Sequence, residues 1–74
     1  MKINDLNFEI VSSGDKRDGL GIEVWLDEKL IIEIFRNDIK KIKEVSTYLN
    51  DIPLEVIEFS IEYFKKEIPE NYMD

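Results

Sequence analysis

The chain has 74 residues, of which 17 are Asp or Glu and 10 are Lys or Arg, giving a formal charge of −7. This length leaves room for one small core, so we expect a single domain over residues 1–74. There is no cysteine and no histidine, which excludes disulfides, thiolate zinc sites and catalysis by a Ser-His or Cys-His pair. The acidity argues against direct nucleic acid binding through phosphates and favours a basic protein partner.

Neither a membrane span nor a secretory signal is visible in the sequence. The longest aliphatic run is Leu30-Ile31-Ile32, and residues 1–6 alternate polar and apolar side chains without an apolar stretch before a cleavage site. The absence of cysteine fits a reducing compartment. We therefore expect a cytoplasmic protein that makes no membrane contact.

The first predicted strand covers residues 7–11, where polar and apolar side chains alternate, and Leu6 extends it. Residues 12–21 contain three glycines and four charged residues, a composition that disfavours helix and strand and predicts a long hairpin loop. The β-rich runs 22–26 and 30–35 are separated only by Asp27-Glu28-Lys29 and predict a second hairpin. Strand alternation then places one apolar set towards a covering helix: Phe8, Ile10, Ile22, Val24, Leu26, Leu30, Ile32 and Ile34.

Residues 39–49 follow a predicted turn at Arg36-Asn37-Asp38 and fit two structures. Apolar residues recur at spacings of three, three and four, as in a helix, whereas residues 45–48 have strand propensity. We favour a fourth strand, because a third meander turn needs only a short connection. The alternative is a three-stranded sheet with a second helix.

The last predicted element is a helix that begins near Pro53 and ends before Pro69. Its apolar residues recur at spacings of three and four on one face: Leu54, Ile57, Ile61, Phe64 and Ile68. Val56 and Phe59 widen this apolar stripe, as expected for a helix that lies across a sheet. The polar tail from Glu70 to Asp74 is expected to fray. The predicted fold is therefore α+β, an antiparallel β-meander of three or four strands with one C-terminal α-helix packed on one face.

The sheet face opposite the helix is the first candidate binding surface. Strand alternation places there a glutamate from each of three strands, together with aromatic and aliphatic residues. Like charges facing one another across strands are destabilising, so these carboxylates do not stabilise the sheet. Acidic groups around an aromatic centre resemble a protein-binding site. The predicted set, with its last two members dependent on the fourth strand, is Glu9, Glu23, Trp25, Ile31, Glu33, Phe35, Glu44 and Tyr48.

A stripe along the predicted helix is the second candidate surface. Asp51, Glu55, Glu58 and Glu62 stand at spacings of four, three and four, which puts them on one helix face. Successive carboxylates would lie roughly 5 to 6 Å apart along the helix axis. A ladder of this kind could imitate a line of phosphates, although an exposed helix face explains it as well.

Catalytic and metal-binding patterns are weak throughout the chain. The glycines at 14, 19 and 21 match neither a P-loop nor a Rossmann motif, and no loop matches the EF-hand pattern. We expect no cofactor, no metal site and no enzymatic activity, with a hydrolase that uses paired carboxylates as the remaining catalytic alternative.

These observations lead to two hypotheses. The first is a small acidic inhibitor or immunity-type protein that covers a basic site on a protein partner, such as a nuclease toxin or another nucleic-acid-handling protein. In general character the chain is similar to the small acidic immunity and anti-defence proteins of bacteria and phages, without a motif diagnostic of a family. The second is a homodimeric structural or adaptor module that buries the open sheet face against its own copy.

Overall fold

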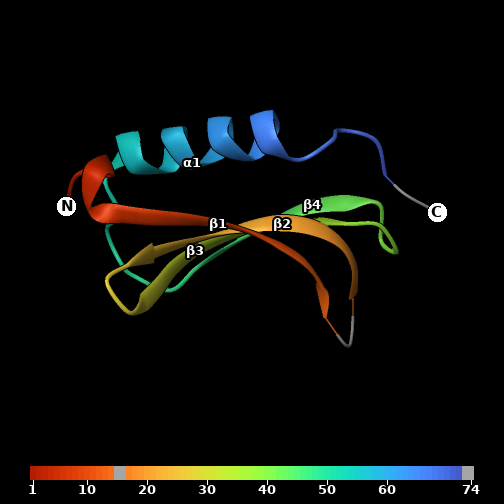
Figure 1. Cartoon of the computed structure of the whole chain (residues 1–74), viewed down its shortest axis with the longest axis horizontal. Helices are drawn as coiled ribbons and strands as arrows, with labels where there is room; N and C mark the ends of the chain where they lie inside the picture. Colours follow the sequence, from red (N-terminus) through yellow and green to blue (C-terminus); the bar gives the residue numbers. More distant parts are fainter. Residues whose placement is uncertain (15–16, 73–74) are drawn as a thin grey trace.

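The protein folds as a four-stranded antiparallel sheet with one helix on one face, which confirms the predicted α+β meander (Figure 1). The computed structural model describes residues 1–14 and 17–72. The strands lie in chain order, each paired with its sequence neighbour. The elements are η1 (Ile3–Asp5), β1 (Leu6–Gly14), β2 (Arg17–Leu26), β3 (Lys29–Asn37), β4 (Ile42–Thr47) and α1 (Leu54–Glu67).

The ambiguous segment 39–49 contains a strand, as we favoured, and β4 pairs antiparallel with β3. The turn before it lies at residues 38–41, because Arg36 and Asn37 still belong to β3. The Asn37 side chain organises this turn, since its Oδ1 accepts hydrogen bonds from the backbone N–H of Ile39 and of Lys40. The predicted turn at Arg36-Asn37-Asp38 was therefore placed two residues too early.

The long loop predicted over residues 12–21 is wrong, because most of these residues are in strands. β1 continues to Gly14 and β2 begins at Arg17, while residues 15 and 16 lie outside the described residues. Gly19 has a φ of +148°, and a Cβ there would overlap the carbonyl oxygen of Arg36. A Cβ at Gly21 would lie 2.7 Å from Cδ1 of Phe35. These two glycines therefore serve close packing against β3 rather than a loop.

The core lies between α1 and the sheet face that carries Ile22, Val24, Ile32 and Ile34, each at most 4% exposed. On the helix, the buried line consists of Val56, Ser60 and Phe64, at the i, i+4 spacing of one helix face. The predicted stripe is confirmed for Phe64 and Ile68, which are buried, and for Ile57 and Ile61, which are half-buried and pack against the core. Leu54, at 68% exposed, does not belong to it.

A buried arginine, Arg36, forms an ion pair next to the sheet and also holds the C-terminal segment. Arg36 is 1% exposed, and its guanidinium donates to both carboxylate oxygens of Asp38, at 2.8 and 3.1 Å. A third donor, Nη1, lies 2.8 Å from the carbonyl oxygen of Pro69. Beyond it, Tyr72 is half-buried, and the ammonium groups of Lys41 and Lys43 lie 5.7 and 5.1 Å from the centre of its ring. The described part of the predicted fraying tail is therefore held in place, while residues 73 and 74 lie outside the described residues.

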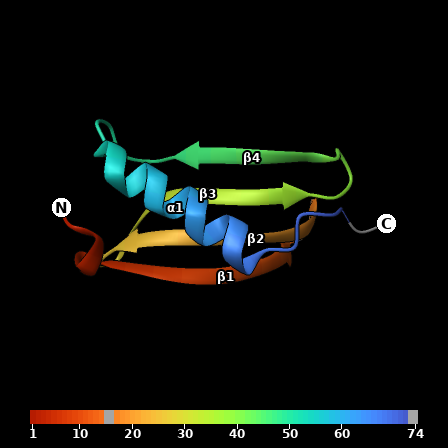
Figure 2. The same ribbon diagram turned by 90° about the horizontal axis from the view of Figure 1, so that it is seen from above.

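α1 crosses the sheet diagonally, from the side of β4 at its N-terminus towards β1 at its C-terminus (Figure 2). This direction leaves the beginning of β4 uncovered by the helix. On the other side of α1, Phe8 of β1 packs against the rings of Phe59 and Tyr63, with centroid distances of 5.2 and 5.0 Å. No helix in residues 1–14 and 17–72 has the length and apolar composition needed to cross a lipid bilayer.

Candidate protein-binding site

A row of three glutamates crosses the sheet on the face away from α1. In the register of the strands, Glu9 of β1 lies opposite Glu23 of β2, and Glu23 lies opposite Glu33 of β3. Directly opposed side chains have Cβ atoms about 4.5 to 5.5 Å apart, so each glutamate side chain begins beside that of its neighbour in the row. Their exposure falls along the row, from exposed at Glu9 to half-buried at Glu23 and 9% at Glu33. The predicted grouping of the three glutamates is present in the structure.

Trp25 lies beside this row and is hydrogen-bonded to Glu23. Its Nε1 lies 3.2 Å from Oε1 of Glu23 and donates a hydrogen bond to that carboxylate. Both side chains are half-buried. The bond fixes the orientation of the indole relative to the carboxylate, so the two form a preorganised pair of an aromatic surface and an anion.

A β-bulge changes the composition of the predicted face. The register between β2 and β3 shifts after Val24, so that Trp25 pairs with Leu30 and Ile31 has no partner of its own on β2. Ile31 is fully buried and belongs to the core cluster. Since a one-residue shift moves side chains to the other face, Leu30 takes the place beside Trp25 that Ile31 was predicted to occupy. The placement of Ile31 on the binding face and of Leu30 towards the helix was therefore wrong.

Phe35 lies in the predicted strand position but not on an accessible surface. It pairs with Gly21 on one side and with Glu44 on the other, yet it is only 1% exposed. Its ring lies against the backbone of Gly19 and Gly21, where larger residues would collide with it. Gly21, directly opposite Phe35, and Gly19, two residues before it on β2, are the sequence signal for this packing. Phe35 therefore supports the face and does not offer contact area to a partner.

Glu44 and Tyr48 differ in what they contribute. Oε1 of Glu44 accepts a 2.8 Å hydrogen bond from Nδ2 of Asn37, which connects this half-buried carboxylate to the turn between β3 and β4. Tyr48 follows the end of β4, is 50% exposed, and its backbone N–H bonds to the carbonyl of Ile31. The exposed or half-buried members of the predicted set are thus Glu9, Glu23, Trp25, Glu44 and Tyr48. We call these five residues, together with Glu33, the acidic face.

The helix stripe is shorter than predicted. Glu55, Glu58 and Glu62 are exposed on α1, but Asp51 lies in a bend before the helix, with a φ of +57°. The predicted ladder of four carboxylates therefore has three members on the helix. Because α1 covers the other side of the sheet, this stripe and the acidic face lie on opposite sides of the molecule (Figure 1). They are two separate surfaces.

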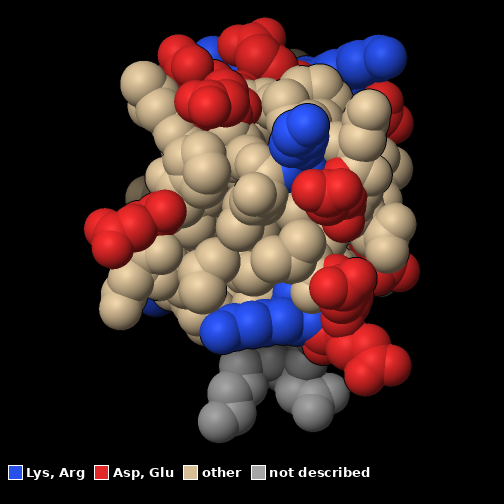
Figure 3. Space-filling view, turned by 90° about the vertical axis from the view of Figure 1, so that its left-hand side faces the viewer, with Lys and Arg blue, Asp and Glu red and all other residues tan. Residues whose placement is uncertain are grey.

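The charge distribution at one end of the molecule is visible in Figure 3. This view faces the end where the N-terminus, the start of α1 and the turn between β2 and β3 lie, and shows a broad uncharged area with both acidic and basic groups around it. Leu54, the first residue of α1, and Tyr48, before it in the sequence, are among the exposed apolar residues. An uncharged centre with charged groups at its edge is typical of protein interfaces.

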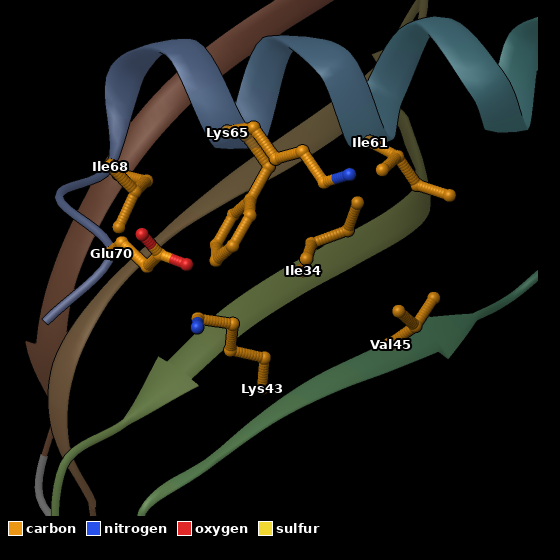
Figure 4. Close-up of a pocket in the computed structure, with 8 residues that line it drawn as sticks. Ile34, Lys43, Val45, Ile61, Lys65, Ile68 and Glu70 are labelled. Carbon is orange, nitrogen blue, oxygen red and sulfur yellow. The ribbon is translucent and has the colours of Figure 1, made fainter. Parts of the chain in front are cut away.

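A groove on the helix side of the sheet was missed by the sequence analysis. It lies between α1 above and β3 and β4 below, with Lys43, Lys65 and Glu70 among its lining residues (Figure 4). The alternation of Lys43 and Val45 along β4 is the signal that places both on the helix side. No role was predicted for these lysines from the sequence.

The fold and the acidic face define a small α+β domain with a preorganised, carboxylate-rich sheet surface. Among residues 1–14 and 17–72, no group of three or more His, Cys, Asp or Glu side chains is arranged to hold a metal ion. Comparisons with protein-family models, with curated proteins and with solved structures found no match. The geometry of the chain is therefore the basis of the functional proposal.

Proposed function

We propose that the protein is a non-catalytic, acidic binding protein of the inhibitor or immunity type, which covers a basic site on a protein partner with its acidic face. The observation that carries this proposal is the row of Glu9, Glu23 and Glu33 on three adjacent strands, next to a tryptophan hydrogen-bonded to the row. In this proposal the two proteins meet in the cytoplasm, and the partner is a nuclease toxin or another nucleic-acid-handling protein.

The physical support is that Glu9 and Glu23 lie opposite one another across the β1–β2 pair, an arrangement of like charges that costs stability in the isolated protein. Opposed like charges destabilise a sheet by some tenths of a kcal/mol per pair. A partner that inserts arginine or lysine between the carboxylates would relieve this repulsion and gain charge-assisted hydrogen bonds. The indole of Trp25 supplies apolar area and an aromatic face for a guanidinium. The charge of −7 speeds the encounter with a basic surface.

The experiment is an affinity pull-down from lysate of the source cells with three forms of the full chain. These are the wild type, a sheet variant with Glu9→Gln and Glu23→Gln, and a helix variant with Glu58→Gln and Glu62→Gln. Both variants lose two negative charges, so a difference between them reports position and not net charge. We expect a basic protein to bind the wild type and the helix variant, and the sheet variant to lose about 2 kcal/mol of binding energy, roughly 30-fold in affinity.

A second sheet variant, Trp25→Ala, removes the aromatic surface without changing charge. It is expected to weaken the same complex by at least tenfold, about 1.4 kcal/mol, if the indole lies at the centre of the interface. Recovery of no basic protein, or equal losses in the sheet and helix variants, would contradict the proposal.

The second candidate is a homodimer that buries the same sheet face. It is favoured by Ile42 and Tyr48, which are 44% and 50% exposed on or next to the edge strand β4. A symmetric dimer would, however, bring two glutamate rows together, which is why we place it second. Native mass spectrometry at high protein concentration separates the two: a strict monomer contradicts the dimer, and a stable dimer lost in Tyr48→Ala supports it.

A further inference from the structure

The groove between α1 and β4 has the size and shape of a small-molecule site. Its volume is about 500 Å³, within the range of roughly 300 to 1,000 Å³ that is common for ligand pockets. Figure 4 shows Ile34 and Val45 of the sheet facing Ile61 of the helix across this space. Ile68, just after the helix, closes one end. Apolar side chains therefore line the groove on its sheet side, on its helix side and at one end.

The apolar lining extends from the core to the solvent. Ile34, Phe64 and Ile68 are at most 5% exposed and form the inner part. Val45 is 57% exposed and forms the outer part, on the edge strand that α1 leaves uncovered (Figure 2). An alkyl chain laid along this path would cover Val45 and remove its exposed apolar surface from water.

Cations are concentrated around this groove, although the protein as a whole is acidic. Lys43 of β4 and Lys65 of α1 line it from opposite sides, and Figure 4 shows both side chains beside the space. The turn before β4 and the end of α1 lie at the same end of the molecule (Figures 1 and 2). Half of the ten basic residues lie in these two segments or in β4: Lys40, Lys41, Lys43, Lys65 and Lys66.

We propose that this groove binds a single-chain amphiphile with an anionic head group, such as a fatty carboxylate free in solution. The chain lies along Ile34, Val45 and Ile61, and the exposed side chains of Lys43 and Lys65, whose ammonium groups point in different directions in Figure 4, turn towards the head group. The complementarity of charge selects an anion, because among the described residues two cations and one carboxylate, that of Glu70, line the groove. The site uses none of the residues of the acidic face and does not depend on the proposed function.

A strand from another protein is a poorer occupant of this edge. Lysines on an edge strand disfavour the addition of a further strand. Lys43 lies within β4, and Lys40 and Lys41 lie in the turn that precedes it. The same lysines that oppose strand pairing attract a small anion, so the groove favours an amphiphile over a second sheet.

The test uses the full chain and dodecanoate, at concentrations below micelle formation, in isothermal titration calorimetry. We expect 1:1 binding with a dissociation constant below about 1 mM, the weak end of the usual affinity scale. Replacing both groove lysines, Lys43→Gln with Lys65→Gln, is expected to weaken binding about tenfold. The control Lys2→Gln with Lys29→Gln removes the same charge outside the groove and outside the lysine-rich segments around it, and should change affinity by less than about twofold. Dodecanol, which lacks the anion, should bind the wild type about tenfold more weakly than dodecanoate.

A second pair of variants tests the apolar path. Val45→Glu places a carboxylate in the groove and should abolish dodecanoate binding. Its control is Ile10→Glu, since Ile10 is 52% exposed on the same sheet face but on the opposite edge strand, β1. Circular dichroism of both variants verifies that they are folded; if Val45→Glu is unfolded, Val45→Ser, which is neutral, replaces it and should weaken binding at least threefold.

Four results would overturn the proposal. They are the absence of dodecanoate binding, equal effects of the groove variants and their controls, binding only to anionic phospholipid vesicles, and formation of a Val45-dependent dimer that dodecanoate does not disrupt. The last two would assign the groove to a membrane surface or to a second copy of the chain.

Discussion

Arg36 shows how a single charged residue can belong to the core of an acidic protein. Its guanidinium is 1% exposed and uses the fork geometry of arginine to bind both oxygens of Asp38. The remaining nitrogen holds the carbonyl of Pro69, 33 positions further along the chain. Since lysine cannot make this set of planar hydrogen bonds, the position requires arginine.

Replacing Arg36 by methionine is expected to lower the free energy of unfolding by about 3 kcal/mol. The change removes the cation that binds the buried carboxylate of Asp38, and breaking such pairs from one side is strongly destabilising. Urea unfolding followed by circular dichroism measures the loss. The exposed neighbour Lys40, changed to methionine, is the control and should stay within about 0.5 kcal/mol of wild type. An Arg36→Met protein within 1 kcal/mol of wild type would mean that the buried pair contributes little.

For the glutamate row we expect the opposite effect on stability, since removing its charges should stabilise the protein. Changing Glu9 and Glu23 together to glutamine keeps an acceptor for the Trp25 N–H and removes the repulsion along the row. We expect the free energy of unfolding to rise by about 0.5 kcal/mol at low salt, with a smaller gain at 1 M salt, where charges are screened. Glu28→Gln, in the exposed turn between β2 and β3, is the control and should give no gain. A destabilised double variant would show that the row stabilises the sheet and would remove the main support for a binding role.

At the scale of elements, α1 approaches the sheet closely because its centre carries a small residue. Ser60 is 0% exposed between Val56 and Phe64, and its hydroxyl donates to the carbonyl of Val56. A serine in this position satisfies its own polar group within the helix and leaves room for the aliphatic side chains of β2 and β3.

Ser60→Leu is therefore expected to destabilise the protein by about 2 kcal/mol, because the larger side chain must push α1 away from the sheet. Ser60→Ala keeps the size and raises helix propensity, so it should stay within about 0.5 kcal/mol of wild type. Thermal and urea unfolding of both variants provide the comparison. A leucine variant as stable as the alanine variant would indicate unfilled space under the centre of α1.

Local patterns predicted most elements, and tertiary contacts explain the failures. Strand alternation and helical spacing predicted the hairpin of β2 and β3 and the presence of α1, and chain topology favoured β4. The glycines of β2 were misread as a loop, because the contacts that require glycine there are made across the sheet, with Phe35 and the backbone of Arg36. The bulge after Val24 was invisible, since Leu30, Ile31 and Ile32 are all aliphatic and accept either phase.

At the scale of the whole molecule, the candidate sites were predicted unequally. The acidic face could be found because a glutamate row needs only correct strand phasing, which Glu9, Glu23 and Glu33 have. The groove could not be predicted, because it depends on the direction in which α1 crosses the sheet. No local sequence pattern determines that direction. The net charge of −7 also gave no indication of a cationic groove, because it does not show that lysines gather near the end of α1.

The hydrogen bond between Trp25 and Glu23 has an optical consequence. Trp25 is the single tryptophan of the chain, and its half-buried indole reports only on the acidic face. A partner that covers this face is expected to shift the wavelength of tryptophan emission, whereas dodecanoate in the groove on the other side of the sheet should leave it unchanged. Equal emission shifts for both ligands would show that the two surfaces are coupled through the sheet. The protein thus carries its own fluorophore at one surface, and unlabelled titrations can tell which of its two sides is occupied.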